Sequence, residues 1–171
     1  MKRFLFFVIC FCCLSLSFSQ NKSSIDFVIR NVGIAVDGHF NTFNIETDFD
    51  NKGELLNIKG EIKVASIETG IESRDNHILK ADYFDIENHE NITWISKAIN
   101  TIDDGVFTMI ADLTIKGKTK EISITVNRDK INNKYKITSS FKINRRNFDV
   151  GGRSIVMSNT VKINVVHYHN L

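Results

Sequence analysis

Histidine is the side chain whose charge changes most readily near neutral pH, and the sequence contains five of them. His167 and His169 are two residues apart, so on a strand they share one face and could chelate a divalent metal if another ligand came near. His77 and His89 each lie close to an aspartate, as an acid–base pair would require. Two histidines are too few ligands for a metal site, and histidines near the end of a chain are usually exposed. His77 and His89 are explained more simply as polar surface residues. We therefore expect no metal, no cofactor and no catalytic residue.

Arginine supplies the only notable basic cluster, formed by Arg145, Arg146 and Arg153. One guanidinium could donate a fork of hydrogen bonds to a phosphate or carbonyl group of a ligand. Ion pairing with Asp149, or simple solvation, is the alternative that we favour, because charge clusters are common on protein surfaces. The sequence contains neither a nucleophile elbow nor a zinc-protease helix motif. These observations favour a protein that is not an enzyme.

The start of the chain has the pattern of a secretory signal peptide. Lys2 and Arg3 form a basic start, residues 4–16 are an apolar run, and residues 17–19 supply small side chains for cleavage. A membrane-spanning helix needs about 20 apolar residues, and this run is shorter and is followed by polar residues. We predict a signal peptide at residues 1–19, and a periplasmic or secreted protein.

Removal of residues 1–19 would change both the cysteine content and the charge of the protein. Cys10, Cys12 and Cys13 all lie in this segment, which excludes disulfides, cysteine zinc sites and cysteine nucleophiles from residues 20–171. Two basic residues are also lost, which leaves 20 basic side chains (22 − 2) against 20 acidic ones. A neutral chain gives no electrostatic reason to expect nucleic acid or an anionic membrane as a partner, and we expect no stable membrane insertion after removal of the signal peptide. The remaining 152 residues (171 − 19) are enough for one domain.

The elements that must position these side chains are strands, because apolar and polar residues alternate along nearly all of residues 20–171. Each alternating segment is typical of a strand with one dry face. If these faces point into one barrel, they line its interior. The residues that we predict to line it and to bind a ligand are Phe43, Ile45, Phe49, Ile58, Ile62, Trp94, Phe107, Met109, Leu113, Ile122, Ile124, Tyr135, Ile137, Phe141, Ile163 and Val165.

Turn residues separate the alternating segments in the places that hairpins require. They lie at residues 51–53, 103–105, 116–118 and 132–133, and are rich in glycine, asparagine and aspartate, which tolerate positive φ. A further strand is expected from Phe27 to Val36. The count comes to about eight strands in an antiparallel order, and a closed barrel of that size is either filled by its own side chains or holds one small ligand.

Residues 66–95 are the one place where the strand pattern breaks. We predict a short helix from Arg74 to Lys80, begun either by a weak capping box at residues 69–72 or by Ser73 as the N-cap. A helix of about seven residues is not stable alone, so it must lean on the barrel. We expect this helical insert to close one end.

Several segments together resemble the YceI-like family of small secreted proteins. They are residues 27–29 and 38–40, 74–80 with 82–85, 112–117, 146–151 and 161–165. The chain differs from the family pattern at residues 88–91, where a proline is usual, and at Ala111, where glycine is common. The resemblance implies a mainly β fold: a single closed, lipocalin-like antiparallel barrel over residues 20–171, with polyisoprenoid lipid as its ligand.

The function that follows is the non-catalytic binding, sequestration or transport of an elongated apolar lipid in the cell envelope. Apolar surface gains about 25 cal/mol per Å² when it leaves water, so a long hydrocarbon chain needs no directional bond to be held. The alternation alone is equally what a filled core requires, and the resemblance is what favours a hollow one. An envelope stress or interaction protein with a filled barrel is one alternative, an enzyme acting on an isoprenoid lipid is another, and a homodimer is left open.

Overall fold

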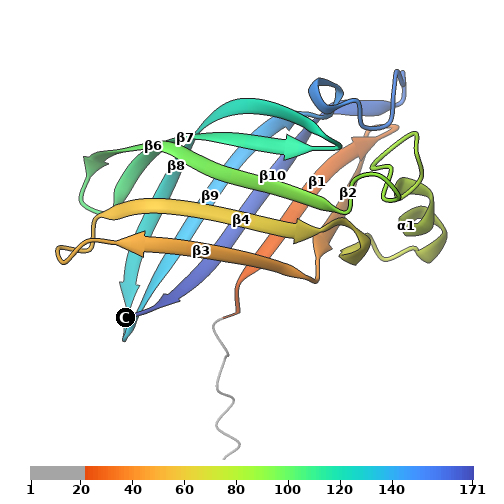
Figure 1. Ribbon diagram of the computed structural model, residues 1–171. Coiled ribbons are helices and arrows are strands. Elements are labelled where there is room, and N and C mark those ends of the chain that lie inside the picture. The colour runs from red at the N-terminus through yellow and green to blue at the C-terminus, as the bar shows by residue number, and fades with distance from the viewer. Residues whose placement is uncertain (1–21) are drawn as a thin grey trace, which may run out of the picture.

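The computed structural model describes residues 22–171, which form one curled antiparallel β-sheet with a short helical insert at one end (Figure 1). The predicted signal peptide at residues 1–19 lies outside the described residues. The strands run in the order β3-β4-β6-β7-β8-β9-β10-β1-β2-β5. Their bounds are β1 (Ser24–Asn31), β2 (Ile34–Phe40), β3 (Phe43–Phe49), β4 (Leu55–Lys63), β5 (Ile67–Glu68), β6 (Asn91–Asp103), β7 (Val106–Ile115), β8 (Lys118–Ile131), β9 (Lys134–Asn144) and β10 (Met157–Asn170). The helices are α1 (Glu72–Ile78) and the 3-10 turns η1 (Val64–Ser66) and η2 (Arg145–Phe148).

The mainly β, antiparallel fold is confirmed, but the closed barrel of about eight strands is wrong. The sheet has ten strands, and its two outermost strands, β3 and β5, do not pair with each other. One additional strand arises because the segment from Phe27 to Val36 is a hairpin rather than a single strand. Its two turn residues, Val32 and Gly33, have φ values of 51° and 79°. Two positive φ values in succession are typical of a type I′ hairpin, but valine is a poor residue for that conformation and conceals it.

The free edge of β3 has no backbone ladder to another strand, and two backbone hydrogen bonds and one side-chain contact join β2–β3 to other parts of the half-barrel. At one end, Asn41 N donates to Ser66 O and Lys63 N donates to Thr42 O, both at 3.0 Å, so β2–β3 and β4–β5 bend together as one corner. Farther along β3, the Thr47 hydroxyl is 2.9 Å from Nδ1 of the histidine at position 169. The structure is therefore a half-barrel with a side-chain seam.

A second gap in the ladder lies between β8 and β9. These strands pair only from Asn127–Ile131 to Lys134–Thr138, although β8 begins nine residues earlier, at Lys118. Beyond the last pair the strands separate, and the hydroxyl of Ser139 donates to the carbonyl oxygen of Thr125 at 2.6 Å. β8 keeps its ladder with β7, and β9 keeps its ladder with β10.

The four predicted turns are confirmed, whereas burial of the inner face differs among the strands, from strict alternation on β7 to no fully buried residue on β10. Gly53, Gly105, Lys116, Gly117 and Asn132 have positive φ values within the four predicted turns. The clearest dry face belongs to β7, in which buried and half-buried residues alternate strictly along all ten positions. This strand has a ladder on both sides, and it forms the best-buried part of the core.

The helix in the insert begins two residues earlier than predicted, at Glu72, and uses neither predicted cap. Its N-cap is Ile71, which makes no side-chain capping bond. Thr69 instead donates through its backbone N to Asp75 Oδ1 at 3.0 Å, and its hydroxyl donates to the same oxygen. The helix lies at one end of the sheet (Figure 1). We call this end the α1 end.

Replacement of Phe107 by alanine tests this description of the core. The ring is 0% exposed, so Phe107→Ala should lower the free energy of unfolding by about 3–5 kcal/mol, measured by urea denaturation. Ile102→Ala is the control, because this side chain is 61% exposed and its loss should cost less than about 0.5 kcal/mol. A Phe107→Ala protein as stable as the wild type would contradict the placement of the ring.

Candidate ligand-binding cavity

The curled sheet encloses a cavity of about 340 Å³, within the range of small-molecule binding sites. Nearly every strand contributes to its wall. The apolar residues that line it are Ile25, Phe27, Ile29, Val36, Phe40, Ile58, Ile62, Ile67, Ile78, Tyr83, Phe84, Ile92, Trp94, Met109, Leu113, Ile115, Ile122, Ile124, Val126, Ile137, Phe141, Ile143, Phe148, Val150, Met157, Val161, Ile163 and Val165. The few polar residues in the wall include Thr69, Arg74, His77, Arg145 and His167.

The structure places most of the predicted ligand-binding residues on this wall. Those that line the cavity are Ile58, Ile62, Trp94, Met109, Leu113, Ile122, Ile124, Ile137, Phe141, Ile163 and Val165. Phe43 and Ile45 on β3 do not line it and instead pack in the core. Phe49, Phe107 and Tyr135 also lie outside the lining.

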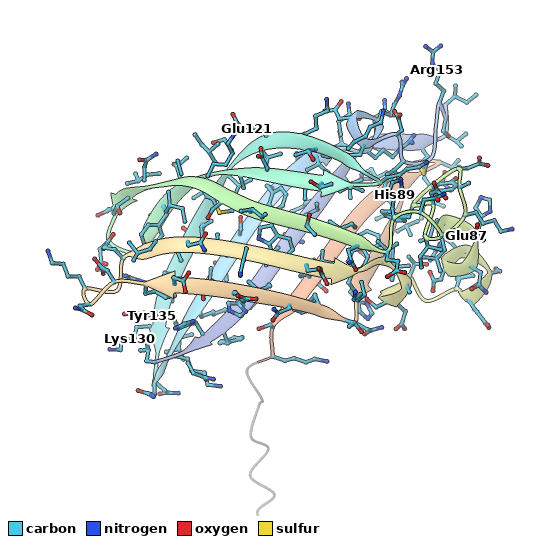
Figure 2. The ribbon with its side chains drawn as sticks, viewed as in Figure 1. Glu87, His89, Glu121, Lys130, Tyr135 and Arg153 are labelled. Carbon is cyan, nitrogen blue, oxygen red and sulfur yellow. The ribbon has the colours of Figure 1, made fainter. Side chains whose placement is uncertain are left out.

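Those last three residues belong to a cluster that fills the end of the half-barrel opposite α1. Phe49 packs on Tyr135 and on the ring of His169, with centroids 4.8 and 5.0 Å apart. The guanidinium of Arg128 lies over Phe107 and Tyr135, 5.8 and 5.1 Å from their centroids. We call Phe49, Phe107, Arg128, Tyr135 and His169 the aromatic plug; Figure 2 shows Tyr135 at this end. The plug explains why its inward-facing aromatic residues do not line the cavity.

One backbone carbonyl group and one carboxylate hold Arg128 in this position and so secure the plug. Its Nη1 donates to the carbonyl oxygen of Gly53, and its Nη2 lies 2.7 Å from Asp104 Oδ1. Both partners are in predicted turns. Two hairpin turns are therefore connected to the aromatic plug through one side chain.

Sequence reasoning missed the part of the wall that β1, β2 and the insert supply. Ile25, Phe27 and Ile29 line the cavity from β1, and their alternation was visible in the sequence. The sequence analysis does not place these three residues on the wall, because it expects one strand where β1 and β2 form a hairpin. In the insert, Tyr83 and Phe84 line the cavity as part of the aromatic-acidic run that interrupts the strand pattern.

Two polar residues of the lining, Arg74 and His77, lie together at the α1 end, whereas His167 lies near the opposite end. Arg74 donates from Nε to the hydroxyl of Thr69 at 2.6 Å and from Nη2 to the Thr69 carbonyl oxygen at 2.5 Å. His77 packs edge-on against Tyr83, with centroids 5.1 Å apart. Asp75 hydrogen-bonds to Thr69, so it does not form the acid–base pair with a histidine that the sequence analysis considered and did not favour. The α1 end therefore combines a fixed guanidinium and an imidazole beside an apolar cavity.

The insert is connected by hydrogen bonds to the loop after η2, and together they cover the α1 end. Lys116 Nζ donates to the carbonyl oxygens of Ala81 and Asp149, at 2.6 and 3.2 Å. Gly151 N donates to the carbonyl oxygen of Asp82 at 2.9 Å. His89 also lies here, with Nε2 4.0 Å from a carboxylate oxygen of Asp85 in the same turn (Figure 2).

Arg145 is buried, with 3% of its surface exposed, and the predicted solvation or pairing with Asp149 is wrong. Asp149 pairs with Lys118 instead. The Arg145 guanidinium donates to backbone carbonyl oxygens, those of Ser158 at 2.8 Å, Val150 at 2.6 Å, Gly152 at 2.9 Å and Met157 at 3.3 Å. Burial lowers the pKa of Arg145 from its ordinary value. This arginine holds the loop before β10 in place and has its donors engaged by the protein.

The two histidines near the end of β10 are half-buried, contrary to the expectation that they are exposed. His167 lines the cavity, and its Nδ1 lies 3.3 Å from the Ser23 hydroxyl. Burial, together with the nearby His169, lowers the pKa of His167 to about 4, so the ring is neutral at pH 7. Residues 22–171 contain no group of three side chains arranged to hold a metal ion.

An antiparallel half-barrel around an apolar cavity defines this chain as a lipocalin-like protein by fold. The model of the YceI-like domain matches residues 17–167, which is most of the chain. This protein therefore belongs to the YceI-like family, as the sequence motifs indicated.

The known relatives are consistent with this assignment. A UPF0312 protein of Staphylococcus epidermidis is 35% identical over 112 residues, covering 64% of this chain and 63% of the relative, so the match spans less than two thirds of its length. Burkholderia cenocepacia BcnA has a TM-score of 0.81 at 21% identity, covering 86% of this chain and 96% of BcnA. A polyisoprenoid-binding domain from Saccharophagus degradans has a TM-score of 0.67 at 14% identity, covering 88% and 95%. The two solved structures show that the fold is shared.

The low pKa of His167 predicts that stability falls as the pH is lowered from about 6.5 to about 4. In this window the unfolded chain binds a proton on this residue and the folded protein does not, so acid favours unfolding. Partial exposure of the ring limits the effect to about 1–2 kcal/mol. Urea denaturation at about pH 7 and about pH 5 should show a smaller loss for His167→Gln than for the wild type. An equal loss in both proteins would contradict the prediction.

Proposed function

We propose that this protein binds one elongated, apolar, isoprenoid-type lipid inside the cavity, and sequesters or carries it in the cell envelope without making or breaking a bond. The observation that supports this most directly is a cavity of about 340 Å³ whose lining is almost entirely aliphatic and aromatic. Such a lining offers little to a polar ligand, whereas hydrocarbon gains about 25 cal/mol for each Å² that it removes from water. The periplasmic or secreted location remains a proposal that depends on residues 1–19.

Incomplete burial of the inner wall supports a hollow interior over a filled one. Phe141, Ile163 and Val165 point to the cavity from β9 and β10, but all three are only half-buried. By contrast, Phe107 and Met109 on β7 are 0% and 2% exposed. Apolar side chains that face inward without being covered leave surface that a ligand can cover.

The polar groups at the α1 end support one orientation for the ligand. Arg74 and His77 lie there beside the cavity, and the aromatic plug fills the opposite end. An amphiphilic lipid would place its head group near the guanidinium of Arg74 and extend its hydrocarbon chain toward the plug. A guanidinium suits a phosphate or carbonyl group in that position, because it can donate more than one hydrogen bond.

The choice of an isoprenoid rests on the ligand that is named for a protein of the same fold. The Saccharophagus degradans domain with this fold is described as polyisoprenoid-binding. Binding without catalysis is favoured because Asp75 hydrogen-bonds to Thr69, and the His77 ring packs on Tyr83, so these residues do not form an acid–base pair.

Extraction of the purified protein with organic solvent, followed by mass spectrometry, tests the proposal directly. We expect an apolar lipid to be recovered from protein isolated from cells, or to be taken up when lipid-free protein is incubated with a prenyl alcohol. Protein that is repeatedly empty, and that takes up no prenyl lipid, would refute the proposal.

A pair of neighbouring substitutions on β10 separates cavity binding from surface binding. Val165 lines the cavity, whereas Val166 is the next residue along the strand, so its side chain points to the opposite face. Val165→Phe should weaken uptake of the prenyl lipid at least about tenfold by filling the cavity, and Val166→Phe should leave uptake unchanged. Equal affinities in the two variants would place the ligand elsewhere.

Trp94 offers the readout for this experiment. It is the only tryptophan in the chain, it lines the cavity, and its ring lies across Gly60, where a Cβ would come within 2.0 Å of it. A lipid in the cavity would displace water from the ring, so the fluorescence emission of Trp94 should shift to shorter wavelength on binding.

A further inference from the structure

We propose that four exposed aliphatic residues at the α1 end dock this protein onto an anionic lipid bilayer. Val32 and Ile34 belong to the β1–β2 hairpin, and Ile155 and Val156 belong to the loop before β10. They are 69%, 70%, 105% and 52% exposed. The backbone N of Val32 donates to the carbonyl oxygen of Val156 at 2.8 Å, which holds the two segments side by side. We call these four residues the aliphatic tip.

The grouping separates the aliphatic tip from the other exposed apolar residues. Single exposed apolar side chains are normal on a soluble protein and need no explanation. Ile102 is of this kind, because it lies between Thr101 and Asp103 on β6. Four aliphatic residues from two joined segments form a contiguous apolar patch, which is typical of an interaction site.

The charges around the aliphatic tip identify an anionic surface as its partner. The two segments, residues 30–36 and 151–157, contain Arg30 and Arg153 and no acidic residue. Arg30 Nη1 donates to the carbonyl oxygen of Gly33 at 3.1 Å, so its guanidinium lies against the hairpin turn. Arg153 is exposed and projects away from the ribbon (Figure 2). Within residues 22–171 neither arginine has an ion-pair partner.

Aliphatic side chains flanked by arginine are the combination that binds the surface of an anionic bilayer. The neutral total charge of residues 20–171 hides this local excess of positive charge. A second copy of the chain fits less well, because a two-fold contact would place the same patch against itself and bring its arginines together. We therefore commit to a lipid surface.

The aliphatic tip adjoins the cavity. Asn31 and Val36 flank the tip on the hairpin, Met157 follows it on β10, and all three line the cavity. Docking would therefore bring this end of the cavity to the bilayer, where an apolar lipid could exchange with little exposure to water. This role of the aliphatic tip in lipid exchange rests on the proposed function. The docking of the tip on a bilayer does not. In the part of the chain that the structure describes, no helix is long and apolar enough to span a membrane.

Co-sedimentation with vesicles tests the docking surface. The probes are phosphatidylcholine vesicles, with and without about a quarter of phosphatidylglycerol. We expect the wild-type protein to sediment with the anionic vesicles and to be released by salt. Ile155→Asp should reduce the bound fraction at least about fivefold, and Arg153→Gln should weaken the dependence on phosphatidylglycerol. Ile102→Asp is the matched control, because this side chain is 61% exposed and lies in the β6–β7 hairpin at the opposite end of the sheet.

The outcomes separate docking from lipid binding in the cavity. Ile155→Asp should still take up prenyl alcohol, as reported by Trp94 emission, whereas Val165→Phe should still sediment with vesicles. Equal sedimentation of the wild type, Ile155→Asp and Ile102→Asp, or no sedimentation with either vesicle, would overturn the docking proposal and leave the cavity ligand unaffected. A concentration-dependent dimer that Ile155→Asp abolishes in analytical ultracentrifugation would also overturn it, in favour of a second copy.

Discussion

The apolar inner face of the curled sheet must satisfy two requirements that oppose each other. Its side chains must leave water to stabilise the fold, yet they must not fill the interior if a ligand is to enter. The structure divides these tasks between regions of one sheet. Phe107, Met109 and Ala111 on β7 are 0%, 2% and 0% exposed, whereas Ile163 and Val165 on β10 face the cavity and are only half-buried. The side chains of β7 are thus fully buried and stabilise the fold, whereas those of β10 leave apolar surface that a ligand could cover.

The two ends of the half-barrel differ in the kind of contact that covers them. At one end, aromatic rings and the Arg128 guanidinium pack against each other and leave no room. At the α1 end, backbone hydrogen bonds connect the insert to the loop after η2, and the buried Arg145 holds that loop through carbonyl oxygens. A loop held by hydrogen bonds can present polar groups such as Arg74 beside the cavity, which an aromatic cluster cannot.

Local patterns in the sequence predicted the strands and the four turns well, because each depends on side chains close together in the chain. The alternation in β7 and the glycine at position 53 are examples. Features that depend on tertiary contacts were not predictable. Val32 adopts a positive φ that its side chain disfavours, and Arg145 donates hydrogen bonds to carbonyl groups that only the fold brings together. In the cavity, alternation identified inward-facing residues but could not tell those that line the void from those, such as Tyr135, that pack into the plug.

The short ladder between β8 and β9 divides the sheet into two panels that share only a few backbone hydrogen bonds. The pairs from Asn127 to Ile131 join the panels on one side, and the bent corner of β2–β3 with β4–β5 joins them on the other. From Lys118 to Val126, β8 pairs with β7 and not with β9, so along this stretch the wall is completed by side chains such as that of Ser139. Side chains, and not backbone hydrogen bonds, therefore set the width of the interior at this place.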